Sequence, residues 1–209
     1  MKFYIDGLAS SQIQVLHQIA PFATERQFYM GGGTALSVFL RHRRSVDLDW
    51  FTLERLVDPM AFAQALRDAA IPFITGQTAP GTLHGLVHEV QVSFMEFRYP
   101  MLSPLVHWPE TGAQLASLDD LACMKLSAIA QRGSKKDFFD VYALCTAHRP
   151  LEEILELYQQ KFSVVDIGPV LYGLVYFDDA DEERDPLLLE NIQWIQVKQA
   201  FRDWVKAIR

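Results

Sequence analysis

Asp47 and Asp49 are the residues of this chain whose type and spacing point most directly to chemistry. Val46, Leu48 and Trp50 alternate with them, which is the period of a β-strand, so both carboxylates should lie on one face. Two like charges at this spacing repel each other unless a cation lies between them. The pair therefore predicts a site for a hard divalent ion, for which we expect Mg²⁺, of the kind that assists phosphoryl transfer.

A glycine turn precedes the acidic pair. Gly31, Gly32 and Gly33 carry no β-carbon, so their backbone N–H groups can approach an anion closely and positive φ costs little. Thr34 is the predicted cap of a short helix that would direct its positive N-terminal end to this turn. Residues 27–30, just before the glycines, form a short apolar run that is typical of a buried strand.

Each signal has an ordinary explanation, because glycine triplets occur in loops and Asp-x-Asp is often a solvated face. Their combination, GGGTAL at 31–36 and RSVDLD at 44–49, resembles the nucleotidyltransferase fold of the DNA polymerase β superfamily. Within that superfamily it is similar to the AbiEii/AbiGii toxin family. The resemblance implies transfer of a nucleotide from an NTP to RNA ends, by a growth-arresting toxin that an antitoxin neutralises.

A second group of polar residues interrupts apolar helical patterns further along the chain. Taken alone, Lys125 is best explained by a packed stem and an ammonium that extends to solvent. Asp137 and Asp140, near a helix start, are explained by the helix dipole. However, LA-x-x-K at 121–125 and RG-x-x-KD-x-x-D at 132–140 resemble the remaining motifs of the AbiEii family.

The resemblance assigns roles to these residues. Asp47 and Asp49 would bind the metal, and Lys125 and Lys136 would stabilise phosphate charge. Asp137 or Asp140 would orient a lysine or accept a proton. The residues that would bind the nucleotide are Gly31, Gly32, Gly33, Thr34, Arg44 and Ser45. All catalytic candidates therefore come from two motifs, Asp47 with Asp49 and residues 125–140.

The chain departs from the superfamily at a third carboxylate, which often joins the first two from a neighbouring strand. The expected position holds Gln91 or Ser93. Glu89 and Glu96 are close in sequence but would require a different strand register. The number of bound metal ions therefore stays open.

Periodicity and punctuation predict the elements around the site. We expect an α+β fold in which a nucleotidyltransferase-type mixed sheet is flanked by helices and followed by a helical C-terminal lobe. Three prolines between residues 98 and 112 place the lobe boundary there. The predicted parts are a helix at 10–22 capped by Ser10 or Ser11, a helix opening at Asp58, strands within 71–97, a catalytic lobe at 1–110, a helical lobe at 111–209, and a solvated acidic connection at 177–186.

Composition limits the class of partner. The formal net charge of −7 argues against a protein that wraps long nucleic acid, whereas local basic patches at 41–44 and 131–136 suit a nucleotide or one end of a folded RNA. No apolar run reaches the length of a membrane span, and the first 20 residues lack the pattern of a signal peptide. We therefore expect a cytoplasmic protein, with Cys123 and Cys145 as free thiols.

Two other functions fit the same residues. One is a small-molecule transferase of the antibiotic-modifying type, with the same metal chemistry and a different acceptor. The other is a binding module without enzyme activity, in which the fold persists after loss of the third carboxylate. A basic cleft would favour an RNA acceptor, and loss of metal binding would favour the module.

Overall fold

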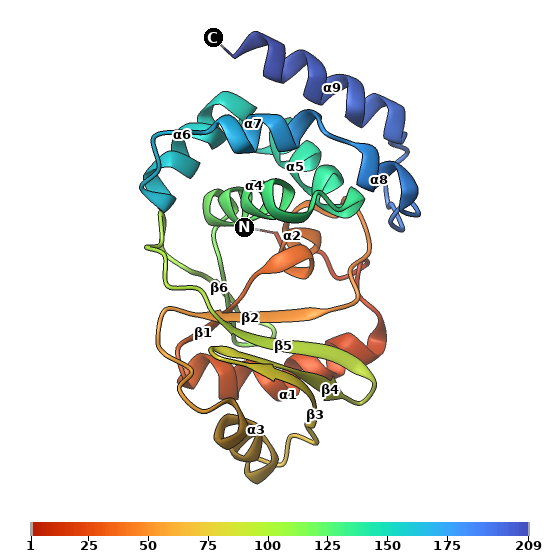
Figure 1. Cartoon of the computed structure of the whole chain (residues 1–209). Coiled ribbons are helices and arrows are strands. Elements are labelled where there is room, and N and C mark those ends of the chain that lie inside the picture. The colour runs from red at the N-terminus through yellow and green to blue at the C-terminus, as the bar shows by residue number, and fades with distance from the viewer. Residues whose placement is uncertain (1, 209) are drawn as a thin grey trace.

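A mixed β-sheet lies across the middle of the molecule, with helices on both of its faces (Figure 1). The computed structural model describes residues 2–208. Within that range the sheet has seven strands in the order β3-β4-β5-β2-β1-β7-β6. The strands are β1 (Phe28–Met30), β2 (Leu48–Thr52), β3 (Ile74–Ala79), β4 (Thr82–Val87), β5 (Val90–Glu96), β6 (Val106–Trp108) and β7 (Ala113–Leu115).

The helices divide into two groups (Figure 1). Helices α1 (Ser10–Glu25) and α3 (Pro59–Asp68) cover one face of the sheet, while α2 (Gly32–Leu40) and α4 (Leu118–Arg132) lie on the other. Beyond α4 lie α5 (Lys135–Ala147), α6 (Leu151–Phe162), α7 (Gly168–Val175), α8 (Asp178–Glu182) and α9 (Trp194–Ala207). The predicted mixed sheet flanked by helices is confirmed.

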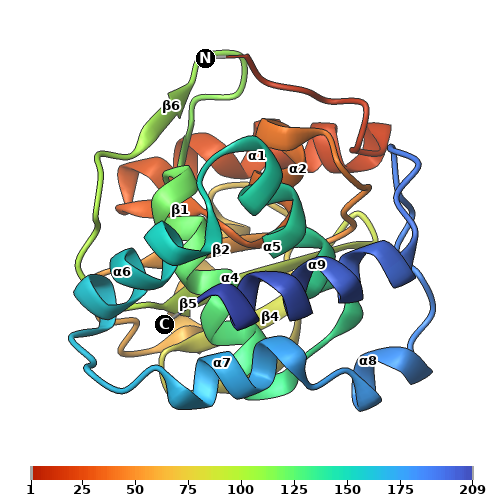
Figure 2. The same cartoon turned by 90° about the horizontal axis from the view of Figure 1, so that it is seen from above.

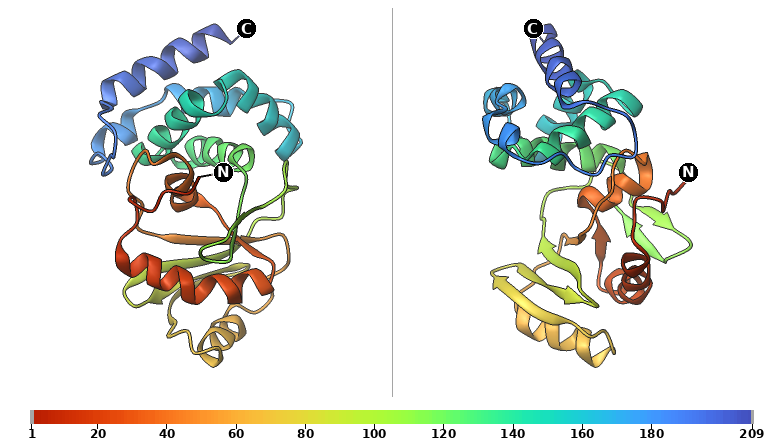
Figure 3. Two further views of the ribbon diagram at one scale, coloured as in Figure 1. Left: turned by 180° about the vertical axis from the view of Figure 1, so that it is seen from behind. Right: turned by 90° about the vertical axis from the view of Figure 1, so that its right-hand side faces the viewer.

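The helical part of the chain forms a layer that is built around α4. Helices α5, α6 and α7 all contact α4, and α9 packs against α5 and α7 on the outside (Figure 2). From the side, this layer forms one end of the molecule and the sheet with α1 and α3 forms the other (Figure 3). Between residues 2 and 208, no helix combines the length and apolar character that a membrane span requires.

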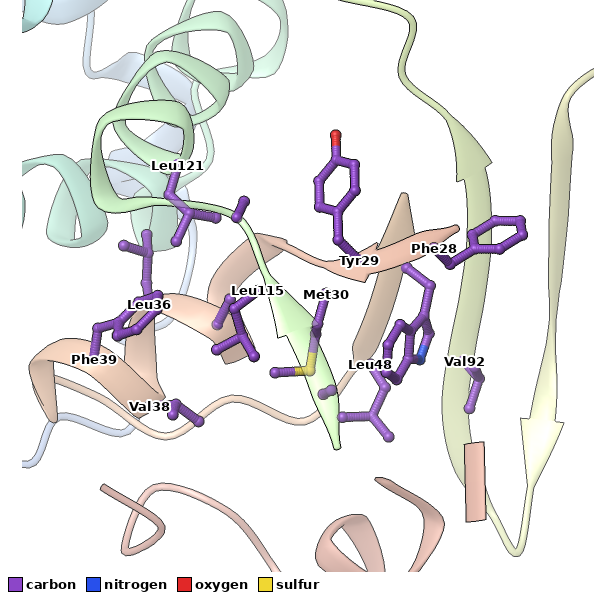
Figure 4. Packing of buried hydrophobic residues seen from close by; sticks show 14 of the residues in the cluster. Phe28, Tyr29, Met30, Leu36, Val38, Phe39, Leu48, Val92, Leu115 and Leu121 are labelled. Carbon is purple, nitrogen blue, oxygen red and sulfur yellow. The ribbon is translucent and has the colours of Figure 1, made fainter. Parts of the chain in front are cut away.

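The core joins the central strands to the helices that carry the site. Met30 of β1, Leu115 of β7, Leu36 of α2 and Leu121 of α4 have no exposed surface (Figure 4). Burying one such side chain contributes about 1.5–3 kcal/mol, so this contact holds α2 and α4 in place against the sheet. The site residues at the ends of these elements are positioned by the same packing.

Strand register determines which side chains face the helical layer. β2 is antiparallel to β1 and parallel to β5, and Asp49 of β2 lies opposite Ser93 of β5. Val90, Val92 and Phe94 of β5 are buried, as their alternation predicts. Their neighbours on the other side of the strand, Ser93 among them, therefore share a face with Asp49.

The predicted starts of α1 and α3 agree with the structure, but the predicted cap of α1 does not. Asp58 caps α3, because its carboxylate accepts a hydrogen bond from the Ala61 N–H at 2.9 Å. Helix α1 begins at Ser10, but its N-cap is Ala9, whose N–H donates to the Gln12 side-chain oxygen at 2.9 Å. The prediction that a serine caps α1 was wrong, since a glutamine two positions into the first turn performs that function.

Residues 178, 179 and 181–185 of the acidic segment 177–186 are exposed, as predicted for a solvated connection, but the segment is also folded and anchored. It contains α8, and the Glu183 carboxylate that follows accepts hydrogen bonds from Ser134 Oγ at 2.8 Å and from the Lys135 N–H at 2.9 Å. Lys135 in turn lies 3.1 Å from Asp185. These acidic side chains anchor the segment to the start of α5, where the helix dipole favours negative charge.

The sheet extends further along the chain than the predicted division at residues 110 and 111. β6 and β7 form an antiparallel hairpin, and β7 pairs in parallel with β1 through Met30 and Leu115. The division falls inside that hairpin, and α4 is the first helix of the helical layer. Prolines at 100, 104 and 109 lie on either side of the short edge strand β6. They are compatible with this strand because an edge strand tolerates a missing backbone N–H.

Candidate active site

The glycine turn brings the start of α2 against the acidic strand. Gly32 has φ of +66°, and a β-carbon there would collide with the Asp49 carboxylate. A β-carbon on Gly33 would collide with the Arg43 guanidinium. Glycine is therefore required at position 32, because of its left-handed backbone and the close Asp49 side chain, and glycine at position 33 leaves room for the Arg43 guanidinium.

Thr34 does not cap α2, contrary to the sequence-based prediction. The helix begins at Gly32 with Gly31 as its N-cap, and Thr34 is buried in the first turn. Its hydroxyl donates a hydrogen bond to the Asp47 carbonyl oxygen. Gly31 and Thr34 lie behind the wall of the cavity described below, so Thr34 supports the Asp47 backbone and does not face a ligand.

The two aspartates lie side by side, although the strand that carries them is shorter than predicted. β2 begins at Leu48, and Val46 is 67% exposed, so the alternation does not extend back through Asp47. The Asp49 carbonyl accepts a hydrogen bond from the Gly31 N–H at 2.9 Å, which ties β2 to the glycine turn. Burial, followed by the charge of Asp47, raises the pKa of Asp49 above its ordinary value.

Within the described residues 2–208, no third carboxylate joins this pair. The register places Ser93 opposite Asp49, and Gln91 is exposed near the start of β5. Glu96 accepts a hydrogen bond from the Leu56 N–H at 2.6 Å, and Glu89 lies in the β4–β5 turn with φ of 67°. Residues 2–208 contain no cluster of three His, Cys, Asp or Glu side chains that suits a metal ion.

Lys125 is buried and does not extend to solvent. Its ammonium lies 2.7 Å from Asp137 Oδ1 and 2.6 Å from Asp140 Oδ2. Burial alone would lower the pKa of Lys125, but the charges of Asp140 and Asp137 outweigh it and raise that pKa. Lys125 therefore keeps its positive charge in the wall of the cavity. The explanation by a solvent-directed ammonium was wrong, because two buried aspartates satisfy the charge instead.

Asp137 and Asp140 form the buried centre of this charge network. Asp140 accepts hydrogen bonds from Arg43 Nε at 2.6 Å and Nη2 at 2.8 Å, and its Oδ1 lies 2.7 Å from His42 Nε2. Asp137 accepts hydrogen bonds from Arg132 at 2.9 and 3.2 Å. Neither aspartate lines the cavity, and all four carboxylate oxygens contact cations or the imidazole. Of their two predicted roles, the geometry favours orientation of Lys125.

The remaining predicted ligand-binding residues reach the cavity from both layers. Ser45 is buried and lines it beside Arg44, whose N–H donates to the Leu187 carbonyl at 2.7 Å. Lys136, in the first turn of α5, is exposed and lies on the opposite wall. The residues predicted from the two distant motifs therefore meet across one space between the sheet and α4.

This space is a cavity of about 590 Å³, within the range of about 300–1,000 Å³ typical of small-molecule sites. One part is apolar, with Phe51, Met95, Phe97 and Met124 in its wall. The other part is charged and carries five cations against three carboxylates. The charged residues are Arg43, Arg44, Lys125, Arg132, Lys136, Asp47, Asp49 and Asp185. A ligand with a planar apolar group and several negative charges matches this division.

The sequence interpretation missed three residues of the site. Arg43, next to the predicted Arg44, is the arginine that binds Asp140. Arg132 binds Asp137, and His84 of β4 lines the cavity. Arg132 belongs to the second motif and was within reach of the sequence. Nothing in the sequence distinguishes Arg43 within its run of basic residues, or His84 from other strand residues.

Asp49→Asn should make the unliganded protein more stable at neutral pH. Because the folded-state pKa of Asp49 is raised, its stabilising contribution is complete below 3.8 and is lost as pH rises through the folded-state value. At pH 7 the wild-type carboxylate is ionised although burial and Asp47 disfavour its charge, and the substitution removes that charge. The variant should therefore melt at least about 2 °C above wild type at pH 7, at roughly 2–4 °C per kcal/mol. The difference should vanish towards pH 3.8.

Melting curves across this pH range test the prediction, with Asp203→Asn on the surface of α9 as the control. A stabilisation that is the same at both ends of the pH range would contradict the assignment to the Asp49 charge.

The chain is similar to known proteins over most of its length. The family model described as nucleotidyl transferase AbiEii toxin, type IV TA system, matches residues 14–104 and 92–206. An uncharacterized protein of Aquifex aeolicus (strain VF5) is 35% identical over 203 residues, covering 95% of this chain and 96% of that protein.

Two solved structures share the fold at low sequence identity. JHP933 from Helicobacter pylori has a TM-score of 0.57 and 17% identity, covering 95% of this chain and 92% of its own. MenT4, a nucleotidyltransferase toxin from Mycobacterium tuberculosis H37Rv, has a TM-score of 0.56 and 13% identity, covering 94% of this chain and 83% of its own. The family model matches most of the chain, and the fold is the same as in these structures. The chain therefore belongs to the AbiEii nucleotidyltransferase toxin family.

Proposed function

We propose that this nucleotidyltransferase is Mg²⁺-dependent, transfers a nucleotide from an NTP to an RNA acceptor, and acts as the toxin of a toxin–antitoxin pair in the cytoplasm. The observation that carries the proposal is the cavity in which Asp47 and Asp49 face Lys125, Arg132 and Lys136. Acidic oxygen ligands on one wall and cations on the other are what a metal-bound triphosphate requires.

Asp47 and Asp49 suit Mg²⁺ even without a third carboxylate. Protein sites commonly hold this ion through one or two carboxylates, with water and substrate phosphates completing the shell. Burial, followed by the charge of Asp47, raises the pKa of Asp49, and a bound cation would stabilise the ionised pair. When bound there, Mg²⁺ would neutralise phosphate oxygens of the NTP.

The helical layer supplies charge from the other side. Lys125 and Arg132 are held by Asp137 and Asp140, so they present positive charge to the cavity in a fixed orientation. Such preorganised charge stabilises a transition state without reorganisation during the reaction. Lys136 is exposed and can move with the phosphates. The apolar wall near Phe51 and Phe97 offers a surface for the base.

The charge of the cavity favours RNA over a cationic drug as the acceptor. Arg44, Arg132 and Lys136 line the open part of the cavity, where an aminoglycoside would meet repulsion and a phosphate backbone would meet attraction. With a formal net charge of −7 the rest of the chain repels long nucleic acid. We therefore infer a short contact with one RNA end. A cognate antitoxin partner follows from the family.

Lys136→Ala is the test of the proposed function. In assays with each labelled NTP, Mg²⁺ and total RNA, wild type should label RNA, and the variant should do so roughly 10- to 100-fold more slowly. The loss is smaller than the roughly 100- to 1,000-fold typical of a buried donor because Lys136 is exposed. Lys206→Ala, an exposed lysine at the end of α9, is the matched control.

Inducible expression extends this test to the cell. Wild type should arrest bacterial growth at matched soluble expression, and Lys136→Ala should relieve the arrest. Label transferred to an aminoglycoside and not to RNA would replace the RNA proposal with a small-molecule transferase. Equal labelling by wild type and Lys136→Ala would exclude a role for this lysine in charge stabilisation.

A further inference from the structure

His84 is a half-buried histidine in the cavity wall whose function the acidic motif and the charge network do not explain. It lies on β4, directly opposite Ser93 of the neighbouring strand β5. Ser93 is in turn directly opposite Asp49 of β2. His84, Ser93 and Asp49 thus form one row across three adjacent strands, on the face of the sheet that lines the cavity.

The imidazole contacts the middle residue of this row. Neighbouring strands are about 4.8 Å apart, so the His84 backbone is roughly 10 Å from that of Asp49. The His84 Nδ1 atom lies 2.8 Å from Ser93 Oγ, so the ring edge that carries Nδ1 faces the intervening strand. His84, Asp47 and Asp49 all line the same cavity, so a bound substrate would contact both the histidine and the aspartates.

The contact with Ser93 also distinguishes the two ring nitrogens. If Nδ1–H donates to Ser93 Oγ, the neutral ring carries its lone pair on Nε2. Within residues 2–208, no hydrogen bond engages Nε2. The ring would then present an unoccupied proton acceptor to the cavity.

We propose that His84, oriented by Ser93, accepts the proton of the attacking hydroxyl in nucleotide transfer. The acceptor oxygen forms a bond to the α-phosphorus of the NTP, while its proton moves to His84 Nε2. The bond from the α-phosphorus to the bridging oxygen breaks, and pyrophosphate leaves with that electron pair. His84 later returns its proton to water. This inference rests on the proposed nucleotide transfer.

The other candidate bases are already engaged. Asp137 and Asp140 are completely buried among cations and do not line the cavity. Asp47 and Asp49 are the proposed metal ligands, and a carboxylate that holds a cation is a weak base. Histidine is the side chain that acts most often as a general base.

The tautomer of His84 can be tested in the unliganded full-length protein, independently of any activity. In ¹⁵N NMR spectra, assigned by comparison with His84→Gln, we expect the proton of the neutral ring on Nδ1. A ring with its neutral-state proton on Nε2 overturns the proposal. This measurement separates a failure of the His84 assignment from a failure of the proposed nucleotide transfer, because it requires no substrate.

The kinetic test uses His84→Ala and a compensating substitution. A general base contributes about 100- to 10,000-fold, so His84→Ala should slow transfer at least about 100-fold. Ser93→Asp in the His84→Ala background, which places a carboxylate opposite Asp49, should restore at least about tenfold. His107→Ala, an exposed histidine on the distant edge strand β6, should leave the rate unchanged.

Binding must be unaffected if His84 acts on the proton alone. The increase in melting temperature caused by Mg²⁺ with NTP should be the same in His84→Gln as in wild type. Loss of that increase would identify His84 as a ligand for the metal or nucleotide and overturn its assignment as proton acceptor. A His84→Ala rate within about threefold of wild type would also overturn it.

Discussion

Asp47→Asn is expected to reduce nucleotide transfer by roughly 100- to 1,000-fold or more, a loss typical of removing one preorganised charge interaction from an active site. The amide has nearly the size of the carboxylate but no charge, so the proposed Mg²⁺ site loses half of its acidic ligands. The backbone contact from Thr34 to the Asp47 carbonyl stays, because it does not involve the side chain. The fold should therefore be intact.

Thermal melting separates this effect from unfolding. A ligand at a hundredfold excess over its dissociation constant stabilises the native state by about 2.7 kcal/mol. For a chain of this length that corresponds to roughly 5–10 °C. Wild type should show such a shift with Mg²⁺ and NTP and a much smaller one with NTP and a chelator, whereas Asp47→Asn should lose the Mg²⁺-dependent part. Turnover by Asp47→Asn close to that of wild type would exclude the two-carboxylate metal site.

Asp140→Asn is expected to destabilise the protein by about 3–5 kcal/mol, the usual cost of removing one partner from a buried ion pair. The side chain of Asp140 is completely buried and binds Arg43, Lys125 and His42. Its loss would leave two buried cations with too little negative charge. The melting temperature should fall by roughly 6–20 °C, at about 2–4 °C per kcal/mol.

The pH dependence of this loss has a defined sign. Burial alone would raise the pKa of Asp140, but Lys125 and Arg43 lower it well below its ordinary value. Its stabilising contribution is therefore present above pH 3.8 and disappears as pH falls through the folded-state value. The deficit of Asp140→Asn should be largest at neutral pH and shrink in acid. Asp49→Asn should show the same pH range with the opposite sign, a stabilisation at neutral pH that shrinks in acid.

A matched control is Asp119→Asn. Asp119 also binds a histidine and an arginine, at 2.7 Å from each, but its side chain is 15% exposed and Arg149 is 40% exposed. Exposed pairs contribute about 0–1 kcal/mol, so this variant should melt close to wild type. Equal effects of the two substitutions in urea or thermal unfolding would contradict the assignment of Asp140 as the centre of a buried network.

The residues that the sequence identified are those whose chemistry has few alternative uses. Three consecutive glycines and two aspartates one strand repeat apart predicted the turn, the strand and the acidic wall. Local patterns suffice there because backbone geometry and charge repulsion act between neighbours in the chain. The same reasoning predicted the start of α3 at Asp58, since the signals for a helix start, here Asp58 followed by Pro59, lie within one helical turn.

Other features depended on contacts between residues distant in the chain. Lys125 was expected to reach solvent, but Asp137 and Asp140 of the next helix hold it. Thr34 was expected to cap a helix, but the Asp47 carbonyl, 13 positions away, takes its hydrogen bond. In each case a tertiary partner competed with the local one and formed the better-buried interaction.

The tertiary structure also selected among equivalent residues. Arg43 and Arg44 are indistinguishable in sequence, yet only Arg43 points inward to Asp140, 97 positions away. His84 gained its position in the cavity solely through pairing of β4 with β5 and of β5 with β2. Strand register is set by the packing of the whole sheet, because a shift by one residue would exchange its buried and exposed faces. The sequence therefore determined which groups can do the chemistry, and the sheet and helical layer decided which of them meet.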